Sequence, residues 1–321
     1  MRVDINSMKL AVVIPAYNEE RTISRVIREI PRRVAGIDEV EVIVIDDGSG
    51  DSTVSKALKA GADRIIRHKM NLGLAASFRD GLDAALEDGA DIIVNTDADL
   101  QYNQKEIPKL IKPILDKEAD FVLGYRKIWN LEHMPLSKKV GNTLATSVIS
   151  FLVGFGVRDA QSGFRAFSRE AALQLNVFSD YTYVQETIMQ LIFNKNKVVQ
   201  VPCEFRARDG RSRLINNIWS YAKRAGLTII RTYVYYKPLR TFLTVGLFLI
   251  LLGLIAGVRV LVHFLTTDLV SPYIPSAILS AVLLIVGFQV VMMGLIADSI
   301  NANRKIIERI LYLLKKKGKE S

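Results

Sequence analysis

The chain has 321 residues, of which 50% are hydrophobic, and it carries a formal net charge of +10. Its length allows one large domain or two smaller units, while its hydrophobic share excludes a disordered chain and its moderate glycine and proline counts exclude collagen-like sequence. The single cysteine, Cys203, excludes a disulfide framework and a cysteine-rich zinc site, and favours a reducing compartment.

Short β-rich runs alternate with amphipathic helical patterns through the first half of the chain. The β-rich runs lie at residues 10–14, 41–45, 64–67, 91–95 and 120–124. The helical patterns lie at residues 19–30, 51–60, 73–88 and 104–118. This alternation predicts an α/β fold with a mixed, mostly parallel sheet and helices on both faces. In that class, ligands bind beyond the carboxyl ends of the strands.

Polar, acidic loops follow three of these strands. Their sequences are PAYNE at residues 15–19, DDGSGDST at 46–53 and TDADLQ at 96–101. Helix caps and turns explain residues such as Asp51 and Thr53. They do not explain four further aspartates, which would repel one another unless a cation or ligand donors lay between them. These four are Asp46, Asp47, Asp97 and Asp99.

The third loop has the ligands of a hard divalent cation. Asp97 and Asp99 lie two residues apart at a strand end, and Gln101 adds an amide oxygen. Such oxygen ligands suit Mg²⁺ or Mn²⁺ rather than zinc, and substrate phosphates usually complete the coordination shell. The sequence contains neither G-x-x-x-x-G-K-[ST] nor G-x-G-x-x-G, which argues against a P-loop NTPase or a dinucleotide dehydrogenase.

The three motifs in this order resemble the GT-A fold of family 2 inverting glycosyltransferases, over about residues 9–213. The resemblance implies that Tyr17, Glu19 and Asp47 hold the base and ribose of a nucleotide sugar. It implies that Asp97 and Asp99 hold the metal that bridges the diphosphate, with Asp99 counted among the catalytic residues. The remaining donor-binding residues would be Pro15, Asn18 and Asp46.

Within that family, the following residues resemble the dolichyl- and polyprenyl-phosphate sugar synthases. Gly124-Tyr-Arg126 stands where Gly-Ser-Arg is usual, so Tyr125 departs from the pattern. The resemblance implies that Arg126, a catalytic residue, binds the acceptor phosphate together with Lys138, which follows Pro135.

Two later blocks extend this resemblance. Residues 158–165, RDAQSGFR, match the family's R-D-x-Q-x-G-F-[KR] block, in which Asp159 is a candidate base if the acceptor is a sugar hydroxyl. Residues 206–213, RARDGRSR, resemble a loop that would close over the diphosphate with Arg208, Ser212 and Arg213. The alternative for this loop is a basic surface beside a membrane.

Two uncharged apolar runs, at residues 241–258 and 269–297, are long enough to cross a bilayer, although buried core helices pass the same test. The tail at 301–321 has seven basic residues and two acidic ones, a net charge of +5. No signal peptide precedes the first strand, and the positive-inside rule therefore places both termini in the cytoplasm. The basic tail favours membrane lipids over nucleic acid.

The predicted organisation has four parts. They are a cytosolic GT-A domain at 1–213, an interfacial region at 214–237, two transmembrane helices within 238–300 (about 241–264 and 274–297), and a cytoplasmic tail at 301–321. The apolar segments 140–155 and 214–236 are either interfacial or ordinary core helices.

The predicted function is transfer of a hexose from a nucleotide sugar to dolichyl or polyprenyl phosphate, with inversion. The lipid phosphate is mostly a dianion at neutral pH, because its second pKa is about 6, and it needs no base. GDP-mannose and UDP-glucose are the leading donors, and UDP-N-acetylglucosamine stays open, as does a homo-oligomer. The rivals are a polysaccharide-forming family 2 enzyme, which would resemble chains with Q-x-x-R-W and more membrane spans, and a non-catalytic membrane scaffold.

Overall fold

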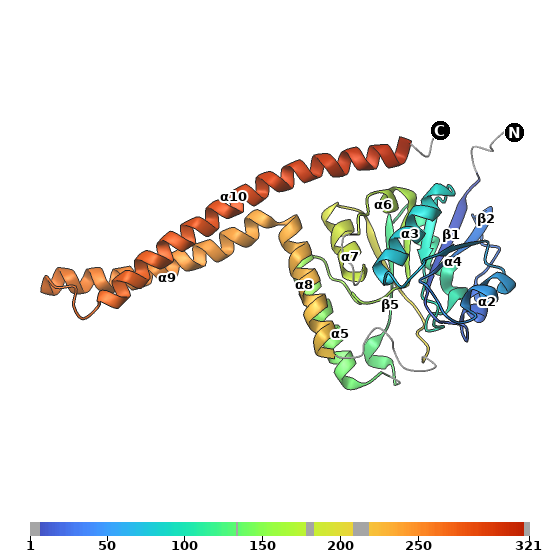
Figure 1. The fold of residues 1–321 in the computed structure, drawn as a ribbon, viewed down its shortest axis with the longest axis horizontal. Helices are drawn as coiled ribbons and strands as arrows, with labels where there is room; N and C mark the ends of the chain where they lie inside the picture. The colour runs from blue at the N-terminus through green and yellow to red at the C-terminus, as the bar shows by residue number, and fades with distance from the viewer. Residues whose placement is uncertain (1–6, 133, 178–182, 208–217, 318–321) are drawn as a thin grey trace. The chain divides into compact units, whose positions relative to one another are not determined.

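The computed structural model describes residues 7–132, 134–177, 183–207 and 218–317. The chain divides into two compact units, one formed by Met1–Ile229 with Tyr312–Ser321 and the other by Ile230–Leu311. The first unit contains a seven-stranded sheet covered by helices, and the second is dominated by two long helices joined by a turn (Figure 1).

The sheet has the strand order β3-β2-β1-β4-β6-β5-β7. Its strands are β1 (Lys9–Ala16), β2 (Glu39–Asp46), β3 (Arg64–Arg67), β4 (Ile92–Asn95), β5 (Phe121–Tyr125), β6 (Arg165–Ser168) and β7 (Val198–Pro202). Strand β6 runs antiparallel to β4 and β5, and the other neighbouring strands are parallel. The predicted mixed, mostly parallel α/β fold is therefore confirmed.

Helices cover both faces of this sheet. In the described chain, the helices before the two long ones are α1 (Ile23–Glu29), α2 (Thr53–Ala60), α3 (Leu74–Glu87), α4 (Ile107–Leu115), α5 (Leu136–Val153), α6 (Arg169–Leu173), α7 (Val184–Phe193) and α8 (Ile218–Tyr236), with 3₁₀ turns η1 (Gln104–Glu106) and η2 (Ile128–Asn130). Of these, α1, α2 and α4 lie on one face of the sheet and α3 lies on the other. Strand β1 is central and almost wholly buried, as a parallel strand covered on both faces must be. Its Leu10, Val12 and Ile14 share one core with α1, α2 and α4, while Val13 faces α3.

The five predicted strands all form, within two residues of their expected ends. The sequence pattern did not reveal β6 and β7. Strand β6 has only four residues and begins with a buried arginine, Arg165, so it lacks the apolar run that marks the other strands. Strand β7, VVQVP, lies at the edge of the sheet, where its residues are mostly half-buried.

The helices α9 (Pro238–Thr267) and α10 (Ile274–Lys317) form a helical hairpin, and the second unit contains α9 and the part of α10 that ends at Leu311. Glycines let the two backbones approach, because a β-carbon on Gly246 would lie 2.9 Å from the carbonyl oxygen of Gly287. The Ser280 hydroxyl donates a 2.7 Å hydrogen bond to the carbonyl of Gly253. Small residues thus occupy the positions where the two helices approach each other most closely.

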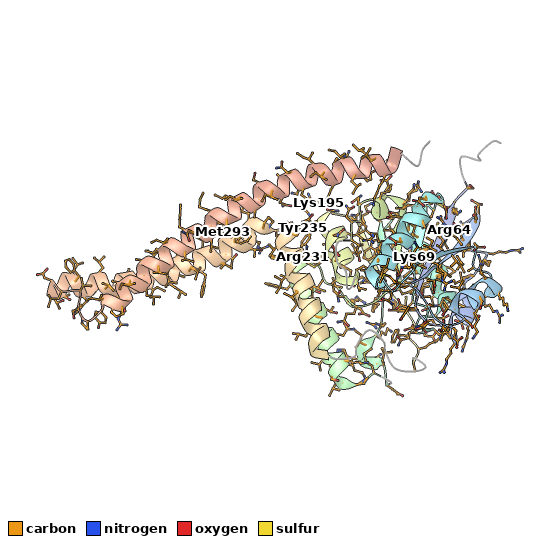
Figure 2. The ribbon with its side chains drawn as sticks, in the orientation of Figure 1. Arg64, Lys69, Lys195, Arg231, Tyr235 and Met293 are labelled. Atoms are coloured by element: carbon orange, nitrogen blue, oxygen red, sulfur yellow. The ribbon has the colours of Figure 1, made fainter. Side chains whose placement is uncertain are left out.

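Both hairpin helices turn most of their apolar side chains outward. Their most apolar windows have mean hydropathies of 2.6 and 2.5, and only 11% and 17% of these windows are buried. Figure 2 shows such outward side chains along the hairpin, Met293 among them. Core helices of a soluble domain bury their apolar faces, so this exposure favours the membrane-spanning interpretation.

A close approach between α3 and the sheet gives the first testable prediction. A β-carbon on Gly81 would lie 2.4 Å from Cγ1 of Val13 and 2.7 Å from Cδ1 of Ile45. We expect Gly81→Ala to lower the free energy of unfolding by about 1–3 kcal/mol through overpacking. The melting temperature in detergent, followed by scanning fluorimetry, measures the effect.

The control is Gly141→Ala on α5, where a β-carbon would meet nothing within 4 Å. That substitution should be neutral or stabilise by about 0.5–1 kcal/mol, because alanine is the better helix former. Equal melting temperatures for the two variants would contradict the close packing of α3.

Candidate active site

The carboxyl ends of β2, β1 and β4 lie next to one another in the sheet, so the three acidic loops meet at one edge. Asn18 joins the first two loops: its backbone N–H donates to the Ser49 hydroxyl at 2.8 Å, and its Oδ1 accepts from the Gly50 N–H at 2.8 Å. The residue has a φ of 54°, a left-handed conformation that asparagine tolerates. Asn18 therefore shapes this edge through backbone contacts.

The other residues of the first loop lie at the same edge. Pro15 lies in the buried run of β1, which ends at Ala16, and Tyr17 just beyond the strand is 39% exposed. The backbone N–H of Glu19 donates to the Thr53 hydroxyl at 2.8 Å, and its carboxylate accepts from Thr22 at 3.1 Å. An exposed aromatic ring beside a carboxylate is suited to stacking on a base and binding its polar edge.

The two aspartates of the second loop are both buried but make different contacts. The Asp46 carboxylate accepts from the Ser49 N–H at 3.3 Å and pairs with the Arg67 guanidinium at 3.2 Å. Asp47 instead contacts the loop after β3. It accepts from the backbone N–H groups of Leu72 and Gly73 at 2.8 and 2.9 Å, and lies 2.8 Å from the His68 ring.

The third loop presents the predicted metal ligands. Asp99 is 8% exposed and accepts from the backbone N–H of Gln101 at 3.2 Å, with Leu100 between them in a left-handed conformation. Among the residues described, no group of three or more His, Cys, Asp or Glu side chains is placed to hold a metal. The loop itself contains two carboxylates and an amide. This donor set fits Mg²⁺ or Mn²⁺ when substrate phosphates complete the coordination shell.

Gly163, from the RDAQSGFR block, lies directly against the first of these carboxylates. A β-carbon on Gly163 would lie 3.0 Å from each carboxylate oxygen of Asp97. Its N–H donates to the Tyr102 hydroxyl at 2.9 Å, and its carbonyl accepts from Asn95 at 2.9 Å. A β-carbon here would crowd the Asp97 carboxylate and require it to shift, so the block packs closely against one side of the predicted metal site.

A buried polar network extends from this block, and sequence reasoning missed most of it. Asn95 also donates to the Tyr183 hydroxyl at 2.7 Å. Burial, reinforced by the nearby Asp97 carboxylate, raises the pKa of both Tyr102 and Tyr183. Both phenols therefore stay protonated at neutral pH, and their oxygens accept the hydrogen bonds from Asn95 and Gly163. Asn95 and Tyr102 flank the TDADLQ loop in sequence, and this position could have identified them as part of the site.

Arg126 and Asp159 form a buried ion pair. The arginine Nε and Nη2 donate to the two carboxylate oxygens at 2.6 and 2.9 Å. The side chains are 10% and 0% exposed. Burial opposes the positive charge, but the Asp159 carboxylate outweighs it and raises the pKa of Arg126 above its ordinary value. Asn142 of α5 and the Gln161 N–H donate to the same carboxylate at 3.4 and 3.2 Å.

A second arginine, Arg165, is fully buried, and within the described residues its hydrogen bonds go to neutral oxygens. It donates to the Ser162 carbonyl at 2.8 Å and to the Thr187 hydroxyl at 2.6 Å. Burial lowers the pKa of Arg165 to about 10, so it is still charged at neutral pH. Its positive charge offsets part of the charge of Asp97 and Asp159, which interact with it electrostatically.

The remaining predicted residues lie farther out or outside the described chain. Lys138 is exposed at the start of α5. Arg208, Ser212 and Arg213 fall outside the residues that the structure describes. The start of their loop is described: the N–H of Arg206 donates to the Gln101 carbonyl at 2.7 Å, which joins this loop to the predicted metal loop.

Comparison with known proteins identifies the family. The profile described as glycosyl transferase family 2 matches residues 11–175, and one described as the GtrB C-terminal hairpin matches residues 237–302. The UDP-N-acetylglucosamine–dolichyl-phosphate N-acetylglucosaminyltransferase of Methanococcus voltae is 36% identical over 217 residues, which cover 60% of this chain and 83% of that protein. The dolichyl-phosphate hexose transferase of Haloferax volcanii is 32% identical over 205 residues, covering 64% and 86%.

A solved structure shares the fold. It is the glucosyl-3-phosphoglycerate synthase of Mycobacterium tuberculosis, crystallised with Mn²⁺, UDP and glucosyl-3-phosphoglycerate. It aligns with a TM-score of 0.56 and 25% identity over 71% of this chain and 80% of that chain. The family 2 profile covers more than half of the chain, from β1 to α6, and includes all three acidic loops. The chain therefore belongs to glycosyl transferase family 2 and is a glycosyltransferase with a GtrB-type C-terminal hairpin.

Proposed function

We propose that this enzyme transfers a hexose or N-acetylhexosamine from a nucleotide sugar to dolichyl or polyprenyl phosphate, with inversion at the anomeric carbon. The observation that carries the proposal is the buried Arg126–Asp159 pair beside the metal loop. The names of the Methanococcus and Haloferax relatives support a lipid-phosphate acceptor. They differ in the sugar, so UDP-glucose, GDP-mannose and UDP-N-acetylglucosamine all remain donors to be tested.

Arg126 has the chemistry of a phosphate-binding residue. Asp159 occupies the Nε and one Nη2 donor, which leaves three of the five guanidinium N–H groups for another anion. Because the Asp159 carboxylate is saturated by Arg126, Asn142 and the Gln161 N–H, we assign it a positioning role rather than that of a base. A phosphate dianion needs no base, so this assignment is consistent with direct displacement.

Donor binding would use the loops that meet at the sheet edge. Tyr17 and Glu19 would contact the base and ribose together with the second loop. Asp97, Asp99 and Gln101 would hold Mg²⁺ or Mn²⁺, which neutralises the diphosphate of the leaving group. Arg208, Ser212 and Arg213 would approach the same diphosphate, and Lys138 would assist Arg126 at the acceptor.

Helix α5 supports a membrane-borne acceptor, because its apolar face points away from the domain. Its exposed stripe consists of Leu136, Val140, Leu144, Val148 and Phe151, which are 41–85% exposed. Asn142, Thr146 and Ile149 are its buried residues, and Asn142 contacts Asp159. An ordinary core helix has the opposite arrangement. The helix thus links the proposed acceptor site to an apolar surface suited to a lipid interface.

The hairpin would fix the enzyme to the membrane that contains the acceptor. Two long apolar helices and the match to a GtrB-type hairpin support membrane insertion. The basic residues around these helices lie on the segments before α9 and in the C-terminal tail. By the positive-inside rule, we place the catalytic domain and the tail on the cytoplasmic side.

The direct test of the proposed function is transfer of radiolabelled sugar from each of the three donors to dolichyl phosphate with Mn²⁺. The wild type should label the lipid phosphate with at least one donor, and not the free alcohol dolichol. Asp99→Asn should reduce the rate at least about 100-fold, because the leaving group loses its countercharge. The control is Asp116→Asn at the end of α4, an exposed carboxylate paired with Lys112, which should retain full activity. Full activity of Asp99→Asn would refute the metal assignment.

A double variant distinguishes the effect of Arg126 on stability from its effect on turnover. Arg126→Gln should reduce turnover of dolichyl phosphate about 100-fold and lower stability by about 3–5 kcal/mol, because it leaves Asp159 buried without its partner. Arg126→Gln combined with Asp159→Asn should regain the melting temperature but not the turnover. Nucleotide affinity should stay within about twofold of wild type in both. Recovery of turnover in the double variant would show that Arg126 acts only in folding.

Gly163 provides a test of the metal site that does not depend on turnover. Gly163→Ala should weaken Mn²⁺ binding by about tenfold, because the new methyl group displaces the Asp97 carboxylate. Titration of Mn²⁺, followed by electron paramagnetic resonance with UDP or GDP present, measures this. Gly156→Ala is the control, since a β-carbon there would meet nothing within 4 Å. Unchanged Mn²⁺ affinity in Gly163→Ala would place the metal elsewhere.

A further inference from the structure

A buried histidine lies between two carboxylates at the donor side of the sheet edge. His68 directly follows β3, and its side chain is 6% exposed. Its Nδ1 is 2.8 Å from Oδ1 of Asp47, and its Nε2 is 3.1 Å from Oδ2 of Asp80 on α3. The backbone N–H of His68 donates to the Asp46 carbonyl at 2.9 Å, which fixes the ring beside the second acidic loop.

Each ring nitrogen of His68 has a carboxylate within hydrogen-bond distance. An ionised carboxylate can only accept hydrogen bonds, and a neutral imidazole donates from one nitrogen alone. With a carboxylate at each nitrogen, both contacts are hydrogen bonds only when the ring is an imidazolium cation. The neighbouring arginines do not make the contacts of the His68 ring. Arg67 pairs with Asp46, and Arg79 contacts the other oxygen of Asp80 at 3.3 Å.

Through Asp47, the His68 ring contacts the loop between β3 and α3. Asp47 accepts from the N–H groups of Leu72 and Gly73, which are the last residues before α3. Gly48 packs so closely on this loop that a β-carbon there would lie 2.7 Å from the carbonyl carbon of Met70. The histidine, the aspartate and the loop therefore form one unit.

The loop lies where a donor nucleotide would reach it. Strand β3 is parallel to β2, so the loop that follows it emerges at the same edge as the acidic loops. Its residues 69–72 are exposed, and Lys69 is labelled in Figure 2. The loop thus contributes the Lys69 side chain and the exposed apolar side chains of Met70 and Leu72 to this edge of the sheet.

We propose that His68, which bridges Asp47 and Asp80, is a positioning residue that keeps the 69–73 loop and Asp47 in place for the donor nucleotide. The inference rests on the proposed function, because it assigns nucleotide binding to this edge. Without the ring, Asp47 and the loop lose their connection to Asp80 on α3, and nucleotide affinity falls.

The test measures UDP and GDP binding with Mn²⁺ by calorimetry in detergent, together with sugar transfer at saturating donor, in the full-length protein. His68→Gln should bind the nucleotides about tenfold more weakly than the wild type. Its turnover at saturating donor should stay within about twofold of wild type, because a residue that only positions the nucleotide-binding loop does not touch the reacting atoms. Asp80→Asn should keep the wild-type affinity, because its amide can donate to Nε2 while Nδ1 donates to Asp47. Glu87→Gln, an exposed carboxylate on the same helix, should behave like wild type.

The outcomes separate the two proposals. Wild-type nucleotide affinity in His68→Gln would overturn the role of His68 and leave the proposed function intact. A loss of turnover at saturating donor as large as the loss of affinity would also overturn the positioning role. A wild type that binds neither nucleotide would overturn the proposed function and this inference with it.

Discussion

Negative charge concentrated at the carboxyl edge of the sheet is the constraint around which the first unit is built. Buried carboxylates repel one another and lose their hydration, so each needs a nearby cation or hydrogen-bond donors. Asp46 has Arg67, Asp47 has His68 and two backbone amides, and Asp159 has Arg126. Each of these contacts joins segments far apart in sequence. Charge compensation therefore also determines how the loops of the site are held together.

This arrangement separates two kinds of aspartate that look alike in sequence. Asp47 and Asp159 are engaged in contacts that order a loop and an arginine. The carboxylate of Asp97 lies against the backbone of Gly163, where a β-carbon would crowd it. We therefore distinguish the carboxylates that support the loops from Asp97 and Asp99, which we propose to bind the metal. Arg165 adds a buried positive charge that reduces the cost of assembling them.

Helix α5 relates this chemistry to the membrane. Its buried residues include Asn142, which contacts Asp159, while its outward face is a stripe of large apolar side chains. The same helix therefore touches the pair proposed to bind the acceptor phosphate and presents a surface that water disfavours. A lipid phosphate has matching parts, a charged head and a hydrocarbon chain.

The sequence sufficed for features that local pattern encodes. The five apolar β-runs, the order of the acidic motifs and the two long apolar segments each arise from residues close together in the chain, and period and length identify them. Strand β6 was not predicted, because a four-residue antiparallel strand beginning with Arg165 is stable only between β4 and β5.

Only the tertiary structure decided which charged side chains contact one another. Asp159 is a candidate base in the sequence, and only the fold brings its carboxylate against Arg126, 33 residues away in the chain. His68 showed no motif at all, because its neighbours Asp47 and Asp80 come from a loop and a helix on either side of it in sequence. Charges interact through space, and the order of the strands in the sheet sets the distances between the charged groups. The linear chain therefore specified which chemical groups were present, and folding decided which of them compensate one another.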